Sequence, residues 1–379
     1  MSMPGTIGAV VYDLRASGVV RNLVRIAESA RNAEFDFEIW PLRPQGEFLT
    51  QAERVTTVRP MLDVATKTQR DLDTLRHRRT LCDAIRARAP ALLFSAGNQM
   101  HWHLARAIMP LPTVRRPRFL GRASNAVVSL GQANPLLRAA IKPWERFQYE
   151  AMDHVVAVSG ELRDQLVHGL GLAADRVCVI PNGIDIERFV DGRGPRTGND
   201  RPLILGIGRL SVQKDFSTLI DAVALVDTEP RPVLRILGRG SDAWNARLRE
   251  RAQRVGLADR FELLGHVDDV AEHLHRADLF VSSSRWEGAS NAMLEALACG
   301  TPIVATRAPT GIAEVLKPLG EEWLVPVGDA RALAGAITNR LARPRNSEEQ
   351  AARAHDYNLE MMLTRYRSVF AEQLELALR

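Results

Sequence analysis

Short apolar runs alternate along this chain with longer segments in which apolar residues recur every three or four positions. The first pair is the run at 6–12, TIGAVVY, and the segment at 19–32, VVRNLVRIAESARN. A short continuous apolar run is typical of a strand buried on both faces, and the wider spacing is typical of a helix that covers one face of a sheet. In the first half of the chain the pattern predicts further strand-containing segments at 35–40, 54–59, 91–96, 118–127, 153–167 and 176–185, and a charged helix at 68–89.

The alternation begins again after residues 191–202, DGRGPRTGNDRP, which are rich in glycine, proline and charge and have no periodicity. This composition is typical of an interdomain linker. In the second half, strands are predicted at 202–210, 233–241, 261–267, 278–284, 301–306 and 323–328, and helices at 216–226, 246–257, 270–277, within 281–304, at 330–341 and at 357–378.

Repeated strand–helix units in each half predict an α/β protein with two Rossmann-like, doubly wound parallel sheets that face each other across a cleft. We place an N-terminal domain at 1–183 and a C-terminal domain at 184–355, with a linker at about 188–201. The final segment, 356–379, is predicted to pack back on the N-terminal domain. Because ligands bind at the carboxyl ends of parallel strands, the cleft is the expected ligand site.

The composition is that of an ordinary soluble protein of 379 residues, 46% hydrophobic and 25% charged, and this length suffices for two separate cores. The opening residues lack a basic region followed by a long apolar run, so no signal peptide is predicted. No segment reaches the roughly 18 apolar residues of a membrane span. Cys82, Cys178 and Cys299 are far apart and match no metal or redox spacing, which favours reduced thiols in a cytoplasmic protein.

Charge is distributed unevenly between the two halves. Residues 1–183 hold 24 lysines and arginines against 17 acidic residues, whereas residues 184–379 hold 26 against 28. The cationic excess falls on Arg115, Arg116, Arg118, Arg122, Arg138, Lys142 and Arg146, and the last three lie beside Leu136, Leu137, Ile141, Trp144 and Phe147. Such a segment is either a surface helix packed on its own domain or a contact with an anionic membrane or acceptor. Aromatic and basic residues do not alternate on paired strands, so no nucleic-acid partner is predicted.

Two carboxylates, Glu287 and Glu295, stand eight residues apart within the segment 281–304, VSSSRWEGASNAMLEALACGTPIV. The interval leads from a loop into the following helix, so the two groups address different parts of one ligand rather than one metal ion. The small residues 288–290 let backbone N–H groups approach that ligand, and the helix N-terminus favours a phosphate. Carboxylates would repel a phosphate, so their presence here is explained if they bind the hydroxyls of sugars attached to that phosphate.

A second cluster follows the first strand after the linker, where Gly208 precedes Arg209 and, five residues later, Lys214. Two fixed cations at a strand end can neutralise a diphosphate, although a solvated basic loop has the same composition. The glycines in 206–208 and 238–240 do not continue to the third glycine of a dinucleotide fingerprint. A nicotinamide-dependent enzyme is therefore disfavoured.

Polar residues also follow predicted strands in the first half. Gly18 lies between the first strand and helix, where the missing Cβ either lets the helix N-terminus meet a phosphate or simply allows a tight turn. His101 and His103 follow one strand, and Ser124 and Asn125 follow the next one. Either imidazole is expected to face a substrate at this edge or to pack at the start of its helix.

The second half also carries a series of longer motifs in a fixed order. They are PNGID, GRLSVQKD, LGHVDDV, EGASNAMLEALACGTPIVAT with its pair of glutamates, and LVPVGD. This order resembles the retaining GT-B glycosyltransferases of the large bacterial family numbered four, which use nucleotide-sugar donors. The resemblance covers residues 153–341 well and the first domain thinly.

The resemblance implies a role for each residue of the two clusters. Arg209 and Lys214 would hold the donor diphosphate, helped by the loop at Gly18 from the other domain. Glu287 would bind hydroxyls of the donor sugar, and Glu295 those of the ribose. The other donor-binding positions would be Gly208, Gly288, Ala289, Ser290 and Asn291 on the sugar and phosphate side, and Gly265, His266 and Val267 against the base. Neither a metal nor another cofactor is implied.

Two features depart from the family pattern. Residues 17–20, Ser-Gly-Val-Val, stand where many relatives carry two glycines followed by a short residue and a glutamate, so the glycine contact is kept and the acidic role is not. Arg122, Ser124 and Asn125 stand where many relatives carry a histidine, which changes the acceptor side of the site.

The implied reaction is transfer of a sugar from a nucleoside diphosphate sugar to an acceptor hydroxyl, with retention at the anomeric carbon. The EGASN variant resembles members that build bacterial surface polysaccharides, which implies a glycan or lipid-linked acceptor and a location at the inner face of the membrane. Three alternatives stay open: an inverting enzyme with His101 or His103 as base, a non-catalytic scaffold that binds sugar nucleotides, and a metal-dependent enzyme of the GT-A type. The last would need the Asp71-x-Asp73 pair, which lies in a charged helical run typical of a solvated helix face.

Overall fold

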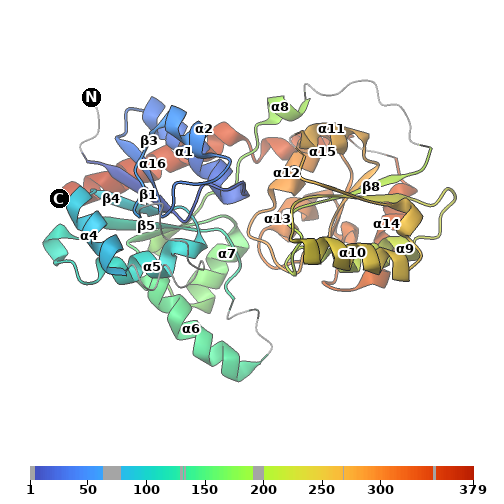
Figure 1. Ribbon diagram of the computed structural model, residues 1–379, viewed down its shortest axis with the longest axis horizontal. Helices are drawn as coiled ribbons and strands as arrows, with labels where there is room; N and C mark the ends of the chain where they lie inside the picture. The colour runs from blue at the N-terminus through green and yellow to red at the C-terminus, as the bar shows by residue number, and fades with distance from the viewer. Residues whose placement is uncertain are drawn as a thin grey trace. The chain divides into compact units, whose positions relative to one another are not determined.

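The protein consists of two compact α/β units, seen in a computed structural model (Figure 1). One unit comprises residues 1–182 and 360–379, and the other comprises residues 183–359. The structure describes residues 5–62, 78–128, 131, 134–190, 200–267, 269–344 and 347–379. Asp71, Asp73 and most of the predicted linker therefore lie outside the described residues.

The first unit is built on a parallel seven-stranded sheet in the order β3-β2-β1-β4-β5-β6-β7. Its strands are β1 (Ile7–Val11), β2 (Phe37–Pro41), β3 (Thr57–Val58), β4 (Leu92–Ser95), β5 (Arg118–Ala123), β6 (His154–Ala157) and β7 (Val177–Val179). In register, Ile7 of β1 pairs with Phe37 on one side and with Leu92 on the other. The strand order reverses between β1 and β4, so the loops that follow these two strands diverge at the carboxyl edge.

The helices of this unit are α1 (Gly18–Asn32), α2 (Leu49–Val55), α4 (Arg78–Arg88), α5 (Asn98–Ile108), α6 (Pro135–Glu150), α7 (Gly160–Asp164) and α16 (Leu359–Leu378). Single turns of 3₁₀ helix lie at Thr113–Arg115 and Ala174–Arg176, and a π-helical turn at Gln165–Gly169 follows α7. In α1, the Ser17 side chain caps the helix by accepting the Val20 N–H at 3.2 Å. Leu23, Ala27 and Ala30 form its buried stripe, which packs the helix on the sheet.

The last helix, α16, belongs to the first unit rather than to the residues that precede it in the chain. The ring of Phe370 packs against Phe35, Phe37 and Phe94, with centroids 6.3, 5.7 and 5.5 Å away. Near its end, Gln373 accepts two hydrogen bonds from the guanidinium of Arg118, at 3.0 and 2.8 Å. Because these rings are buried, α16 completes the core of the first unit.

The second unit is built on a parallel six-stranded sheet in the order β10-β9-β8-β11-β12-β13. Its strands are β8 (Leu203–Ile207), β9 (Val233–Leu237), β10 (Phe261–Gly265), β11 (Leu279–Ser282), β12 (Ile303–Thr306) and β13 (Leu324–Val325). Its helices are α8 (Ile186–Val190), α9 (Phe216–Leu225), α10 (Asp242–Arg254), α11 (Val270–Arg276), α12 (Asn291–Ala298), α13 (Ile312–Leu316), α14 (Ala330–Leu341) and α15 (Ser347–His355), with 3₁₀ turns at Ala258–Arg260, Lys317–Leu319 and Glu321–Trp323. Here the strand order reverses between β8 and β11.

The prediction of two doubly wound parallel sheets is confirmed, and three predictions of local structure were wrong. The strand predicted at 54–59 is shortened to β3, because Leu49, Ala52 and Val55 lie at helical spacing and form α2. The segment predicted as linker from residue 188 begins inside α8, whose Phe189 is buried. Gly18 is the first residue of α1 rather than part of the turn before it.

Candidate functional site

Two loops meet where the strand order of the second unit reverses. One follows β8 and spans residues 208–215, and the other follows β11 and spans residues 283–287. Because β8 and β11 are parallel neighbours, their carboxyl ends bring both loops to the same edge. Three of the hydrogen bonds that join the loops end on backbone carbonyls, from Arg285 N to Gln213 O at 2.8 Å, from Ser283 Oγ to Lys214 O at 2.8 Å, and from Gln213 Nε2 to Trp286 O at 3.0 Å.

The backbone of the first loop is fixed at both ends. Gly208 has a φ of +150°, and a Cβ at this position would lie 2.7 Å from Cε of Lys214. Glycine is therefore required for the lysine side chain to run alongside the strand end. At the other end, Asp215 has a φ of +43° and caps α9 by accepting the backbone N–H of Thr218 at 3.4 Å, and its second carboxylate oxygen accepts the Thr218 hydroxyl at 2.9 Å. Arg285 from the second loop pairs with the same aspartate at 3.1 Å.

The centre of the site is an ion pair between Lys214 and Glu287, 73 residues apart in the chain. Their side chains are 17% and 7% exposed, and the lysine ammonium contacts Oε1 of the glutamate. The hydroxyl of Ser284 donates to the same oxygen at 2.6 Å. Within the described residues Oε2 of Glu287 receives no hydrogen bond, so one oxygen of the carboxylate is held and the other is available to a ligand.

The backbone of Glu287 is held as firmly as its carboxylate. Its N–H donates to the carbonyl of Pro309 at 3.2 Å, and its own carbonyl accepts the hydroxyl of Thr310. The Thr306 hydroxyl donates to the carbonyl of Ser284 at 2.5 Å. Thr306 ends β12 and the other two partners follow it, so the strand beside β11 also fixes the orientation of the glutamate.

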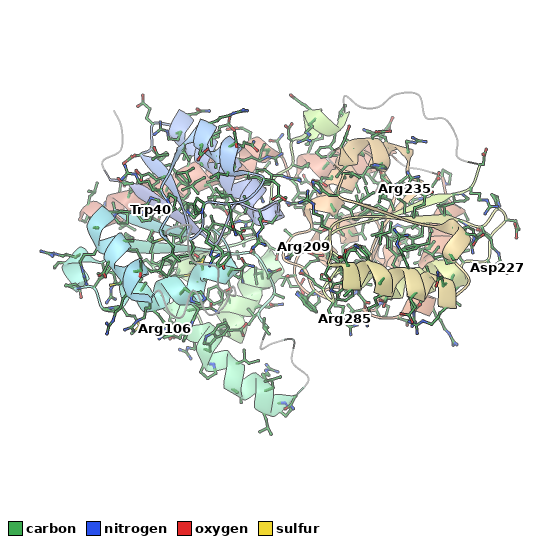
Figure 2. All side chains as sticks on the ribbon, viewed as in Figure 1. Trp40, Arg106, Arg209, Asp227, Arg235 and Arg285 are labelled. Atoms are coloured by element: carbon green, nitrogen blue, oxygen red, sulfur yellow. The ribbon has the colours of Figure 1, made fainter. Side chains whose placement is uncertain are left out.

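Arg209 presents the second cation of this edge. Its side chain is exposed and has no ion pair or hydrogen bond within the part of the chain that the structure describes; Figure 2 labels it together with Arg285. The next residue, Leu210, is 4% exposed, and its N–H donates to the carbonyl of Arg239 at 2.8 Å. A buried leucine thus anchors the loop, while the preceding guanidinium extends into solvent.

Glu295 lies on the helix that follows the second loop. Gly288 and Ser290 are buried, Ala289 is half-buried, and α12 begins directly after them at Asn291. Glu295 is in the second turn of α12 and is 5% exposed. The positive end of the helix dipole therefore falls beside the Glu287 loop, where it favours a negatively charged ligand group.

The predicted base-binding loop lies at the same edge of the sheet. Gly265 ends β10, has a φ of +76° and accepts the Gly238 N–H at 2.6 Å. His266 is exposed and Val267 is half-buried. Because β10, β8 and β11 are parallel strands of one sheet, all donor-binding positions predicted in the second unit follow their carboxyl ends.

The remaining predicted positions lie in the first unit. Gly18 opens α1 after β1 and is exposed. Ser124 and Asn125 follow β5 and are half-buried, as is His103 on α5. The structure thus separates the predicted set into two groups, one at the edge of each sheet.

His101 is completely buried, which agrees with the predicted alternative that it packs at the start of its helix and not with the one in which it faces a substrate. Its Nδ1 lies 2.7 Å from the hydroxyl of Ser95, and its Nε2 is buried without a hydrogen-bond partner. Burial lowers the pKa of His101 to about 3, because the charged imidazolium loses its hydration. The side chain is therefore neutral at physiological pH and serves as a packing residue beside Tyr149, whose ring centroid is 5.5 Å away.

Two residues of these edges were not predicted from sequence. Ser284, which is 1% exposed, orients Glu287 and is marked only by its place in a run of three serines at the end of β11. Asn98 joins the ends of β4 and β5, since its Oδ1 accepts the N–H and hydroxyl of Ser124 at 2.7 and 2.9 Å and its Nδ2 donates to the Tyr149 hydroxyl at 3.1 Å. Nothing in the local sequence distinguishes Asn98 from an ordinary residue at a helix start.

Neither a metal centre nor a membrane span is found in the described part of the chain. Among those residues, no group of three or more histidine, cysteine, aspartate or glutamate side chains could hold a metal ion. No helix in the described ranges has both the length and the apolar content that crossing a bilayer requires.

Two protein-family models match the chain, one in each unit. Residues 16–188 match the model described as Glycosyltransferase Family 4, and residues 201–343 match the model described as Glycosyl transferases group 1. The fold is that of solved GT-B structures: the structure of Anabaena Alr3699/HepE in complex with UDP and glucose covers 97% of this chain and 100% of its own, with a TM-score of 0.75 and 18% identity. The chain therefore has the GT-B fold, and each of its units matches a glycosyltransferase family model.

Among individual relatives, the D-inositol 3-phosphate glycosyltransferase of Geodermatophilus obscurus is 32% identical over 274 residues, which are 68% of this chain and 60% of that protein. The lipopolysaccharide core biosynthesis mannosyltransferase LpsB of Rhizobium meliloti is 31% identical over 242 residues, which are 56% of this chain and 66% of that protein. The chain thus spans less than two thirds of the length of the curated relatives it matches.

Proposed function

We propose that this protein is a retaining glycosyltransferase that moves a sugar from a nucleoside diphosphate sugar to an acceptor hydroxyl. The observation that carries the proposal is the pairing of Lys214 with the buried Glu287 at the strand end that also presents Arg209. A diphosphate requires cations, and a sugar requires hydrogen-bond acceptors for its hydroxyls. This edge offers both within two loops that hydrogen bonds hold together.

In the proposed reaction, the bond between the anomeric carbon and the diphosphate oxygen breaks, and a bond from the same carbon to the acceptor oxygen forms. Negative charge grows on the departing diphosphate, where Arg209 and Lys214 stabilise it. The acceptor proton passes to an oxygen of the departing phosphate, so the mechanism needs no side-chain base. When a donor binds, its diphosphate competes with Glu287 for the lysine ammonium, and sugar hydroxyls donate to the carboxylate instead.

Retention distinguishes this proposal from an inverting enzyme, which would need His101 or His103 as general base. The burial of His101 and its low pKa argue against that residue as a base. NMR of the anomeric signal in the product compares the two mechanisms directly. A product with the anomeric configuration of the donor supports the retaining mechanism. A product with the inverted configuration overturns that mechanism and makes His103 the candidate general base.

The proposed acceptor is a glycan or a lipid-linked saccharide of bacterial polysaccharide or glycolipid biosynthesis. Support comes from the similarity to LpsB, a mannosyltransferase of lipopolysaccharide core biosynthesis. The proposal includes a cytoplasmic location and a peripheral contact of the first unit with the inner face of the membrane, and it needs no metal, other cofactor or nucleic acid. Roles for Gly18, Ser124 and Asn125 at the edge of the first sheet belong to the same proposal.

A thermal-shift series with nucleoside diphosphates and nucleoside diphosphate sugars tests the donor site. A bound ligand stabilises the folded state by RT ln(1 + [L]/Kd), which is about 2.7 kcal/mol at a hundredfold excess over Kd. We expect one nucleotide to raise the melting temperature and its sugar conjugate to raise it further. Slow donor hydrolysis without acceptor would support an enzyme over a scaffold. If no nucleotide shifts the melting temperature, the donor site is wrongly assigned.

Ser284→Ala is expected to lower kcat/KM for transfer roughly 10- to 100-fold, because the variant loses one charge-assisted hydrogen bond to Oε1 of Glu287, worth about 1.5–3 kcal/mol. Steady-state kinetics measure the effect. Ser211→Ala is the matched control, since that hydroxyl lies in the neighbouring loop and its one hydrogen bond to a described residue is to the carbonyl of Arg209, at 3.4 Å. Equal kinetics for the two variants would show that the Ser284 hydroxyl does not position the carboxylate.

A further inference from the structure

Helix α6 (Pro135–Glu150) extends away from the sheet of its own unit, as the green helix in Figure 1 shows. Its start is firmly specified, because Pro135 occupies the first helical position and the side chain of Asn134 accepts the N–H groups of Leu136 and Leu137 at 2.9 and 3.3 Å. All residues from 135 to 140 are nevertheless exposed. The sequence therefore specifies a helix whose first turns are not covered by any described residue of their own unit.

The exposed turns carry large apolar side chains. Leu136 is 80% exposed, Leu137 45% and Trp144 43%. At 100° per residue, positions 136, 140, 144 and 147 fall on one face of the helix. At the far end of this face Trp144 and Phe147 pack on Trp102 of α5, with ring centroids 5.5 and 5.2 Å away. The stripe that attaches α6 to its unit thus continues, uncovered, toward Leu136.

The charges around this stripe have one sign. From Ala84 to Trp144 the sequence contains no aspartate or glutamate. Arg138 and Lys142 lie on the exposed half of α6 and have no ion pair among the described residues. The first acidic residue that follows, Glu145, is buried and accepts the Val128 N–H at 2.7 Å. An apolar stripe opposite a cationic face is typical of a helix that lies in an anionic lipid surface, where leucine and tryptophan enter the interface and long cationic side chains reach phosphates.

We infer that the first half of α6 docks on an anionic membrane surface through Leu136, Leu137 and Trp144, with Arg138 and Lys142 directed to lipid phosphates. This inference names the surface for the membrane contact in the proposed function and rests on that part of it. A second copy of the chain fits less well, because it would cover the leucines and leave Arg138 and Lys142 without a counter-charge.

Vesicle co-sedimentation of the full chain tests the inference, with phosphatidylcholine vesicles compared with vesicles that also contain phosphatidylglycerol. We expect binding to the anionic vesicles only, weakened by added salt. The double variants Leu136→Gln/Leu137→Gln and Arg138→Gln/Lys142→Gln should each weaken binding roughly tenfold or more. Leu225→Gln is the matched control, since this leucine of α9 in the second unit is 54% exposed and should leave binding unchanged. Unchanged melting temperatures show that the variants fold.

Three outcomes overturn the inference: no binding of the unmodified chain to anionic vesicles, equal binding of the leucine double variant, or equal loss with Leu225→Gln. A concentration-dependent dimer in gel filtration that Leu136→Gln/Leu137→Gln abolishes would assign the stripe to a second copy instead. The thermal shift by nucleotides is measured without lipid, so its result is independent. If the chain binds nucleotide but not vesicles, the membrane inference is wrong and the proposed enzymatic function still stands.

Discussion

Replacing Arg209 by alanine is expected to lower the turnover number for sugar transfer on the order of 100- to 1,000-fold, while the melting temperature stays nearly the same. Arg209 is exposed and makes no hydrogen bond or ion pair within the described residues, so its removal leaves no group unpaired. Its proposed partner is the diphosphate, whose charge grows in the transition state. Exposed surface substitutions of this kind change stability by about 0.5 kcal/mol or less.

Steady-state kinetics at saturating donor and thermal unfolding measure both parts of this result. The control is Arg249→Ala, the same change at an exposed position of α10, for which we expect normal turnover. Arg209→Lys adds a further comparison, because a lysine keeps the charge and loses the planar fork that binds two phosphate oxygens. Normal turnover of Arg209→Ala would show that the loop at 208–215 does not bind the diphosphate.

Lys214→Met is expected to abolish transfer and also to lower the free energy of unfolding by about 3 kcal/mol. In this variant the carboxylate of Glu287, whose side chain is 7% exposed, loses the cation that neutralises it. The two cations of the site are therefore expected to differ in a measurable way. Arg209 acts on the ligand alone, and Lys214 also stabilises the fold.

The structural part of the effect is isolated by a double-mutant cycle. Glu287→Gln removes the negative charge, so Lys214→Met/Glu287→Gln should recover most of the stability lost in Lys214→Met, and activity should stay absent in all three variants. Urea unfolding of the full chain, followed by circular dichroism, gives the four free energies. If the two single effects simply add, the ion pair does not contribute to stability.

The fold could be predicted from the sequence because parallel strands buried on both faces require apolar runs, and covering helices require apolar stripes. The segment LILGI became β8, and FSTLIDAVAL became α9. The errors fell on short elements, where one or two turns of helix and a short strand leave similar patterns. α2 and α8, with seven and five residues, are such elements.

The sequence alone determined which kinds of groups the candidate site contains. Cations follow one strand of the second unit, carboxylates follow another, and glycine stands where a side chain would collide with Lys214. These are local properties, since the end of a strand is recognised from the residues next to it.

Only the tertiary structure decided how these groups meet. Lys214 and Glu287 pair across 73 residues because β11 lies directly beside β8 in the sheet. The two strands that come between them in the sequence, β9 and β10, lie on the other side of β8. Packing within each unit likewise left Arg209 in solvent, turned His101 inward and left the first turns of α6 uncovered by the described residues. Strand order and burial depend on the summed packing of the whole sheet, and for that reason no local pattern of residues encodes them.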